Sequence, residues 1–243
     1  MKVLLIHGVG YPESTCPHWS SQWSEVISKY VGVDATFDTI SYDSIFQKNV
    51  QGPKVYVEAI EELLASVGHR ELVGGQLGGV LQSHVGMVAQ WIVETDTRNE
   101  CREALFQSIV SNNPDLILAH SLGTLLSYDL FHNDPRGVQA IENRVIVTFG
   151  SQINNLFVRD KAWGGDISTL QAKRWFHLFN PNDPVFTHDI WLPDANFSST
   201  TTAFGKNFFD VTAHDAVTDP LNPVHCGYLD HSDAPWDKIC SAL

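Results

Sequence analysis

No stretch of the sequence approaches the roughly 20 consecutive apolar residues that a helix needs to cross a bilayer. The opening segment, MKVLLIHGVG, has a short apolar run after Lys2, and this run falls below the roughly 7–15 residues of a signal-peptide core. No small-residue cleavage site follows it. The segment is therefore better interpreted as a short buried strand, and we expect a cytoplasmic protein without stable membrane insertion.

Basic residues are also scarce. The chain has 15 lysines and arginines against 28 acidic residues, which gives a formal net charge of −13, and its densest basic stretch is only Lys173-Arg174. A field of this sign repels phosphate groups, so we expect no nucleic-acid partner.

Neither the cysteines nor the glycines form a cofactor motif. The four cysteines, at positions 16, 101, 226 and 240, include no C-x-x-C pair, so neither a zinc cage nor a thioredoxin-like site is indicated. The glycine-rich residues 68–79 lack G-x-G-x-x-G spacing, and no strand leads into them. We expect no cofactor and no metal, although the His- and Asp-rich tail leaves a metal-dependent hydrolase as an alternative.

Short apolar runs alternate with helical patterns along the chain. The runs at residues 3–6, 116–119, 145–149, 175–179 and 208–212 have the continuous apolar character of strands buried on both faces, and residues 35–42 form a weaker candidate. Helical periodicity covers residues 19–30, 56–67 and 85–109, the last broken near Thr97, and a helix follows Ser121 directly. This alternation predicts a doubly wound α/β fold with a mostly parallel sheet of about six strands. We expect one domain over residues 1–243, with pocket-lining excursions near 68–84 and 186–207.

The most informative segment is Ala119-His-Ser-Leu-Gly123. A predicted strand ends at Ala119, Ser121 stands at the turn, and a helix begins at Leu122. Small residues two before and two after the serine let the strand and the helix approach closely, while the serine takes a strained conformation. The pattern predicts a catalytic nucleophile. The alternative is that Ser121 is a helix N-cap and Gly123 a packing glycine.

A serine needs a base and an acid to become a good nucleophile, and on such an elbow both follow it in the chain. Asp183 lies in the turn just past the strand at 175–179, at the carboxyl edge where open α/β sheets place their sites. The same Asn-Pro-Asn-Asp-Pro segment is also ordinary turn chemistry. Three tail histidines are candidates for the base: His225, which we favour, then His231 and His214.

Two backbone amides should stabilise the oxyanion. The first is that of Leu122, directly after the nucleophile. The second is assigned to Val9, in the loop His7-Gly8-Val9-Gly10 that follows the first predicted strand. His7 and His120 are both interpreted as structural, His7 because it stands at a strand end and His120 because it should point away from the nucleophile.

The motifs together resemble the α/β-hydrolase superfamily, and in particular its small bacterial esterases and lipases. They are His7-Gly-Val-Gly10, Ala119-His-Ser-Leu-Gly123, Asn182-Asp-Pro-Val185 and His225-Cys-Gly-Tyr228. Because the predicted oxyanion loop begins at residue 7, we expect the family's usual first two strands to be absent and the sheet to be trimmed to about six strands. The resemblance implies a cofactor-free acyl-enzyme cycle in which Ser121 attacks, His225 moves the proton and Asp183 holds the imidazolium.

The expected partner is a small-molecule ester with a short- to medium-chain acyl group; the sequence gives no oligomeric state. Five apolar residues are candidates for the acyl pocket or, equally, for the core: Tyr11, Trp19, Phe186, Trp191 and Phe197. A thioesterase, lactonase, amidase or acyltransferase would use the same triad. A non-catalytic binding module on the same fold is the alternative from another class.

Overall fold

The computed structural model describes residues 1–8, 19–48, 54–66, 79–181, 188–201, 228–229 and 233–243. The strands are β1 (Lys2–Ile6), β2 (Thr36–Thr39), β3 (Leu116–His120), β4 (Val145–Phe149), β5 (Arg174–Phe179) and β6 (Phe197–Thr201). The helices are α1 (Trp19–Val31), α2 (Asp43–Lys48), α3 (Lys54–Ser66), α4 (Gly79–Val93), α5 (Thr95–Asn112), α6 (Leu122–Asn133), α7 (Pro135–Ile141), α8 (Leu156–Val158), the π-helical η2 (Arg159–Trp163) and α10 (Trp236–Ala242).

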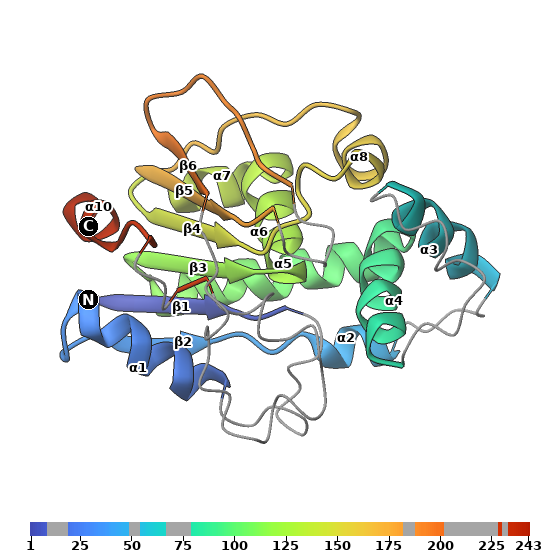
Figure 1. Ribbon diagram of the computed structural model, residues 1–243. Coiled ribbons are helices and arrows are strands. Elements are labelled where there is room, and N and C mark those ends of the chain that lie inside the picture. The colour runs from blue at the N-terminus through green and yellow to red at the C-terminus, as the bar shows by residue number, and fades with distance from the viewer. Residues whose placement is uncertain (9–18, 49–53, 67–78, 182–187, 202–227, 230–232) are drawn as a thin grey trace.

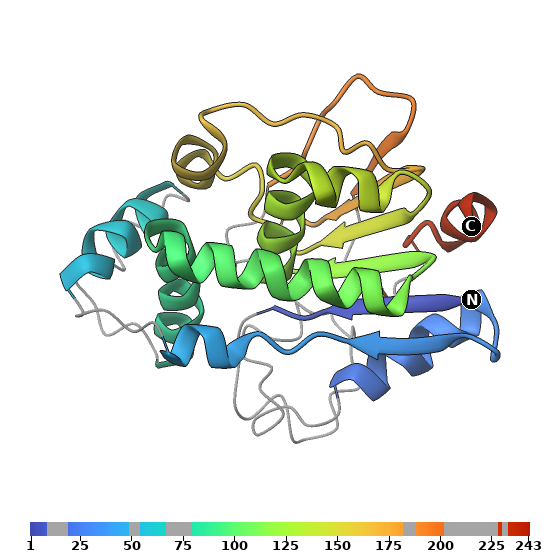
Figure 2. The ribbon, with the colours of Figure 1, turned by 180° about the vertical axis from the view of Figure 1, so that it is seen from behind.

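The strands form one six-stranded sheet in the order β2-β1-β3-β4-β5-β6, and every neighbouring pair is parallel. Helices cover both faces, as Figures 1 and 2 show from opposite sides. The predicted doubly wound α/β fold is therefore confirmed. Since all strands run in the same direction, their carboxyl ends share one edge, which is where ligand sites of open α/β sheets lie.

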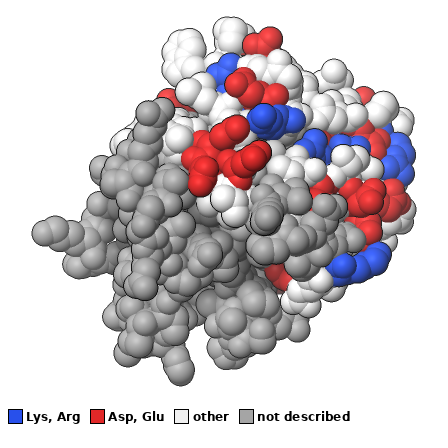
Figure 3. All heavy atoms as spheres, turned by 90° about the vertical axis from the view of Figure 1, so that its right-hand side faces the viewer, with Lys and Arg blue, Asp and Glu red and all other residues white. Residues whose placement is uncertain are grey.

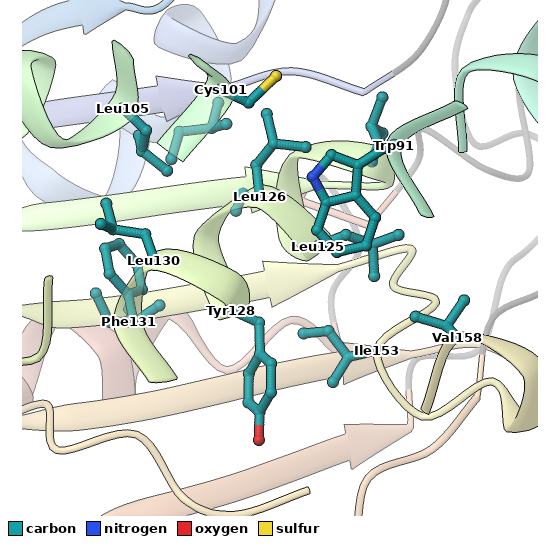
Figure 4. Packing of buried hydrophobic residues seen from close by; sticks show 14 of the residues in the cluster. Trp91, Cys101, Leu105, Leu125, Leu126, Tyr128, Leu130, Phe131, Ile153 and Val158 are labelled. Carbon is teal, nitrogen blue, oxygen red and sulfur yellow. The ribbon is translucent and has the colours of Figure 1, made fainter. Parts of the chain in front are cut away.

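Alternate residues of the central strands feed two separate cores. Val3 and Leu5 of β1 pack with α1 and α10 on one face. Leu4 and Ile6 belong to the larger cluster on the other face, which includes side chains of α5 and α6. Figure 4 shows part of this second core, in which Leu125 and Leu126 of α6 belong to the same cluster as Trp91 of α4. A strand buried on both faces has no polar alternation, which is why the sequence pattern predicts these strands.

Edge strand β6 has no counterpart among the predicted strands. Its sequence, Phe-Ser-Ser-Thr-Thr, has only one apolar residue, and Ser198 to Thr200 are half-buried. β6 lies within the predicted excursion at residues 186–207 and pairs in parallel with β5. The predicted strand at 208–212 lies outside the described residues.

Helices α3 and α4 lie beyond the carboxyl ends of the strands (Figure 1). Asn155, which caps α8 just after β4, donates from Nδ2 to the Ser66 hydroxyl at the end of α3, at 2.8 Å. The helical pattern predicted over residues 85–109 is two helices, α4 and α5, that meet at Glu94 rather than near Thr97. Of the predicted excursion at 68–84, residues 68–78 lie outside the described residues and residues 79–84 belong to α4.

Charges of both signs alternate on the described part of the face beyond the carboxyl ends of the strands (Figure 3). Among the ion pairs of the described residues, Lys48 of α2 lies 3.1 Å from Glu100 of α5, and Lys161 of η2 lies 3.8 Å from Glu62 of α3. Among the described helices, none combines the length and the apolar character that a membrane span requires.

Candidate active site

Ser121 lies between the carboxyl end of β3 and the first turn of α6. Its backbone has φ 51° and ψ −124°, a region that a residue with a Cβ rarely occupies. Within α6 its side chain makes no capping hydrogen bond to the helix amides, although the residue stands at the N-cap position. An ordinary N-cap has extended dihedrals and uses its side-chain oxygen to cap the helix. The strained serine hydroxyl is thus not used for helix capping.

Two glycines allow the chain to close around Ser121. A Cβ on Gly123 would lie 2.4 Å from the backbone oxygen of His7 and 2.8 Å from that of Ile6. A Cβ on Gly8 would lie 2.6 Å from Cβ of Ser121 and 3.2 Å from its Oγ. The end of β1 therefore packs directly against the serine and the start of α6. Val9, the predicted second oxyanion donor, lies outside the described residues.

His7 is held at the end of β1 by the start of α2. Its ring stacks on that of Tyr42 with 4.4 Å between centroids, and its Nε2 lies 3.4 Å from Oδ2 of Asp43. The Tyr42 hydroxyl donates to the His7 carbonyl at 2.5 Å. Burial raises the pKa of the Tyr42 phenol well above its usual range, and the Asp43 charge raises it further, so the phenol remains a donor. These contacts suit the predicted role of His7 as a loop anchor.

His120 packs in an aromatic cluster on the α1 face of the sheet. Its ring centroid lies 5.7 Å from that of Trp23 and 5.0 Å from that of Phe149. The side chain is fully buried. A buried ring between two aromatic neighbours agrees with the structural role that the sequence favours.

The backbone of the turn is held at both Ser121 and Leu122. The Ser121 amide donates to the Phe149 carbonyl at 3.1 Å, which ties the turn to β4. Leu122 is the first residue of α6 and is fully buried. The first amides of a helix have no acceptor within it and carry the positive end of its dipole. The Leu122 amide, the predicted first oxyanion donor, is therefore electrostatically suited to an anion.

The candidate acid, Asp183, lies outside the described residues, but both flanks of its segment are described. Asn180 follows β5 directly and is fully buried. On the other side, the His188 amide donates to the Ser151 carbonyl at 3.2 Å. Ser151 comes just after β4. The described residues on both sides of 182–187 thus lie at the carboxyl edge that also holds Ser121.

The candidate bases His214, His225 and His231 also lie outside the described residues, whereas Tyr228 and Leu229 of the same tail are described. Tyr228 is fully buried, and its ring centroid lies 5.9 Å from that of Phe149. Phe149 is the residue whose carbonyl accepts the Ser121 amide. Tyr228 therefore lies in the core beside the turn that carries the candidate nucleophile.

A buried polar row crosses β4 and β5 below the candidate site. Trp175 Nε1 donates to Thr148 Oγ1 at 2.9 Å, and Thr148 Oγ1 lies 3.0 Å from His177 Nδ1. Because the His188 carbonyl can only accept, His177 Nε2 carries the ring proton and donates to it at 3.2 Å. In the neutral ring Nδ1 then has no proton, so it accepts from the Thr148 hydroxyl. Complete burial lowers the pKa of His177 to about 4, so the ring is neutral in the folded chain.

Because His177 is buried in its neutral form, we expect the protein to lose stability in mild acid. The unfolded His177 binds its proton near its ordinary pKa of 6.5, and the folded one only near 4. The stabilisation is complete above pH 6.5 and is lost as the pH falls towards 4, by about 3 kcal/mol in all. Urea unfolding at pH 7.5 and 4.5 should show the wild type losing about 2–3 kcal/mol more than His177→Gln, whose amide stays neutral. Equal losses in the two proteins would contradict this assignment.

The aromatic pocket candidates fall into three groups. Phe197 packs edge-on against Trp175 with 4.8 Å between centroids and is part of the core, and Trp19 is buried against Trp23. Trp191 is 83% exposed. Tyr11 and Phe186 lie outside the described residues. Of the described candidates, only Trp191 is open to a ligand.

Searching the described part of the chain for three or more His, Cys, Asp or Glu side chains that could hold a metal ion gives no group. Most of the His- and Asp-rich tail lies outside that part.

Sequence reasoning missed four residues near the candidate site. Thr124 bonds to the Ser121 carbonyl and to Ser151, and Tyr42 and Asp43 contact His7 at the end of β1. Ser151 follows a central strand at the carboxyl edge, so the rule that selects Asp183 selects this position too. Thr124 is three residues after the serine and hence on the same helical face. For Tyr42 and Asp43, the weak strand at 35–42 leads to the same edge, but no motif marks them.

Comparisons of the chain with protein-family models, curated proteins and solved structures found no match.

Proposed function

We propose that the chain is a serine hydrolase that cleaves carboxylic esters through an acyl-enzyme on Ser121. The observation that carries the proposal is the conformation of Ser121: a strained residue at the carboxyl end of a central parallel strand, whose hydroxyl does not cap the helix that follows. Strain of this kind costs roughly 1–3 kcal/mol and persists where function requires it. A trimmed α/β-hydrolase fold accounts for both this turn and the order of the strands around it.

His225 is proposed as the base, and the place of Tyr228 supports it. Three residues reach at most about 10 Å, and Tyr228 packs on Phe149, next to Ser121. His231 is equally close to Tyr228 in sequence. However, the chain after Leu229 leads to α10, which lies at the amino ends of the strands (Figure 1). This direction favours the histidine before Tyr228.

Asp183 is proposed as the acid. Its segment leaves β5 at a buried Asn180 and returns at His188, whose amide is bonded to Ser151. Both anchor points belong to the edge of the sheet at which Ser121 stands. An acid in that segment can hold the imidazole in the orientation that accepts the serine proton.

The proposed reaction has two steps. Ser121 Oγ attacks the ester carbonyl while His225 takes its proton, and the oxyanion accepts hydrogen bonds from the Leu122 and Val9 amides. Collapse breaks the acyl–oxygen bond, and His225 returns the proton to the leaving alcohol. Water, activated by the same imidazole, then hydrolyses the acyl-enzyme and frees the serine. We propose acyl groups of short to medium length as substrates.

A substrate panel on the purified full chain tests the reaction class. Nitrophenyl esters of two to eight acyl carbons should be hydrolysed faster than matched thioesters, lactones and amides. Faster hydrolysis of thioesters, lactones or amides would leave the proposed acyl-enzyme mechanism intact and change the proposed substrate class. No turnover on any of the four would favour a binding module on the same fold.

A pair of histidine variants tests the base. We expect His225→Ala to lower kcat by several orders of magnitude because the proton of Ser121 then has no acceptor. His231→Ala, the matched control, should stay within about tenfold of the wild type, since a histidine outside the triad moves no proton in the reaction. The reverse outcome would assign the base to His231 and leave the reaction class intact.

A further inference from the structure

The peptide between Ser121 and Leu122 is fixed by two hydrogen bonds to one carbonyl. The Ser121 carbonyl accepts from the Thr124 amide at 2.9 Å and from the Thr124 hydroxyl at 2.6 Å. The carbonyl and the following N–H of a trans peptide lie in one plane and point in opposite directions. Two donors on the Ser121 carbonyl therefore also fix the direction of the Leu122 N–H.

The Thr124 hydroxyl is itself held by Ser151. Its proton is used on the Ser121 carbonyl, so at 2.8 Å from Ser151 Oγ it can only accept, and the Ser151 hydroxyl is the donor. The Ile153 amide in turn donates to Ser151 Oγ at 3.1 Å. Thr124 and Ser151 are both buried, at 0% and 1% exposed. With water kept out, this directed chain sets a single rotamer of Thr124.

Ser151 also bonds to the first described residue after the segment of the candidate acid. The Ser151 carbonyl accepts from the His188 amide at 3.2 Å, and His188 is the first described residue after 182–187. Ser151 thus connects two parts of the candidate site: the turn at Ser121 and the loop after β5.

We propose that Thr124 and Ser151 are positioning residues for the oxyanion donor. The Thr124 hydroxyl, held by Ser151, fixes the Ser121 carbonyl and with it the direction of the Leu122 N–H. This inference rests on the proposed function, since it assigns a task within that reaction. An amide turned away from the developing charge stabilises the transition state less and leaves the bound ester unaffected. The role therefore predicts a loss in kcat without a change in KM.

The test compares Thr124→Val, which keeps the shape and removes the hydroxyl, with Thr124→Ser, which keeps the hydroxyl. On the best ester of the panel, Thr124→Val should lower kcat about 10- to 100-fold with KM within twofold of the wild type. Thr124→Ser should recover most of the rate. A trifluoromethyl ketone forms a tetrahedral oxyanion on the serine, so its affinity should fall with kcat in Thr124→Val and return in Thr124→Ser.

Ser127→Ala is the matched control. Ser127 is a buried residue of the same helix, and its hydroxyl donates to the Gly123 carbonyl at 2.7 Å, one turn beyond Thr124. It should leave kcat, KM and ketone affinity within twofold, because it does not bond to the Ser121 peptide. If Thr124→Val does not fold, Ser151→Ala takes its place with an expected three- to tenfold loss in kcat.

The outcomes separate the two proposals. A wild type without turnover would overturn the proposed function and this inference with it. An active wild type alongside a folded Thr124→Val with unchanged kcat and unchanged ketone affinity would overturn the inference alone. If Thr124→Val raised KM instead of lowering kcat, or if Ser127→Ala lost as much activity, the effect would be general damage to α6. Either result would also overturn the inference.

Discussion

Ser121→Ala is expected to lower ester hydrolysis by roughly four to six orders of magnitude while the chain stays folded. The alanine removes the only atom proposed to form the acyl-enzyme, and neither the amides of the turn nor the buried neighbours can replace it. The measurement is kcat on the best ester of the panel, with urea unfolding as the check on folding. Ser127→Ala, another buried serine of the same helix, is the control and should retain activity.

A second variant at position 121 separates the effect of backbone strain on stability from the effect of losing the hydroxyl on activity. Ser121→Gly should be as inactive as Ser121→Ala, but glycine adopts φ 51° and ψ −124° without the steric penalty of a Cβ. We expect Ser121→Gly to be about 1–2 kcal/mol more stable than Ser121→Ala. Residual activity within tenfold of the wild type in either variant would show that the serine is not the nucleophile. Equal stabilities would show that the turn is not strained.

Of the substitutions proposed for this chain, Gly123→Ala is expected to reduce stability most, by about 3 kcal/mol or more. The added Cβ would meet two backbone oxygens, those of His7 and Ile6, at 2.4 and 2.8 Å. Neither belongs to a flexible side chain, so β1 or α6 must move as a whole. The turn at Ser121 would move with them, and activity should fall even in the fraction that folds. Urea denaturation followed by circular dichroism measures the change.

Gly86→Ala is the matched control for that substitution. Gly86 lies in α4, and a Cβ there meets nothing within 4 Å. Alanine is the better helix former by up to about 1 kcal/mol, so this variant should be as stable as the wild type or more stable. If Gly123→Ala proved as stable as Gly86→Ala, the close approach of β1 to α6 would be wrong.

The central strands were predictable because burial on both faces removes polar residues from them. β4, at residues 145–149, matches its predicted bounds, and β3 extends its predicted range by one residue to His120. β6 was not predictable in the same way because an edge strand is half exposed and tolerates Ser and Thr. Its pairing depends on the open edge of β5, which no local pattern encodes.

The candidate site, too, was only partly predictable from the sequence. The turn at Ser121 could be predicted because small residues around a serine are a requirement of backbone geometry. Thr124 and Ser151 could not, since their pairing joins residues 27 positions apart and depends on the rotamers of two buried hydroxyls. The tail histidines remain a prediction from chain order, supported by the packing of Tyr228 on Phe149.

Mass spectrometry of the purified protein after treatment with a fluorophosphonate tests the central claim most directly, because only an activated serine attacks this phosphorus. We predict a single covalent adduct, found in the peptide that contains Ser121 and missing from Ser121→Ala. An unmodified protein, or an adduct on another residue that persists in Ser121→Ala, would contradict the account.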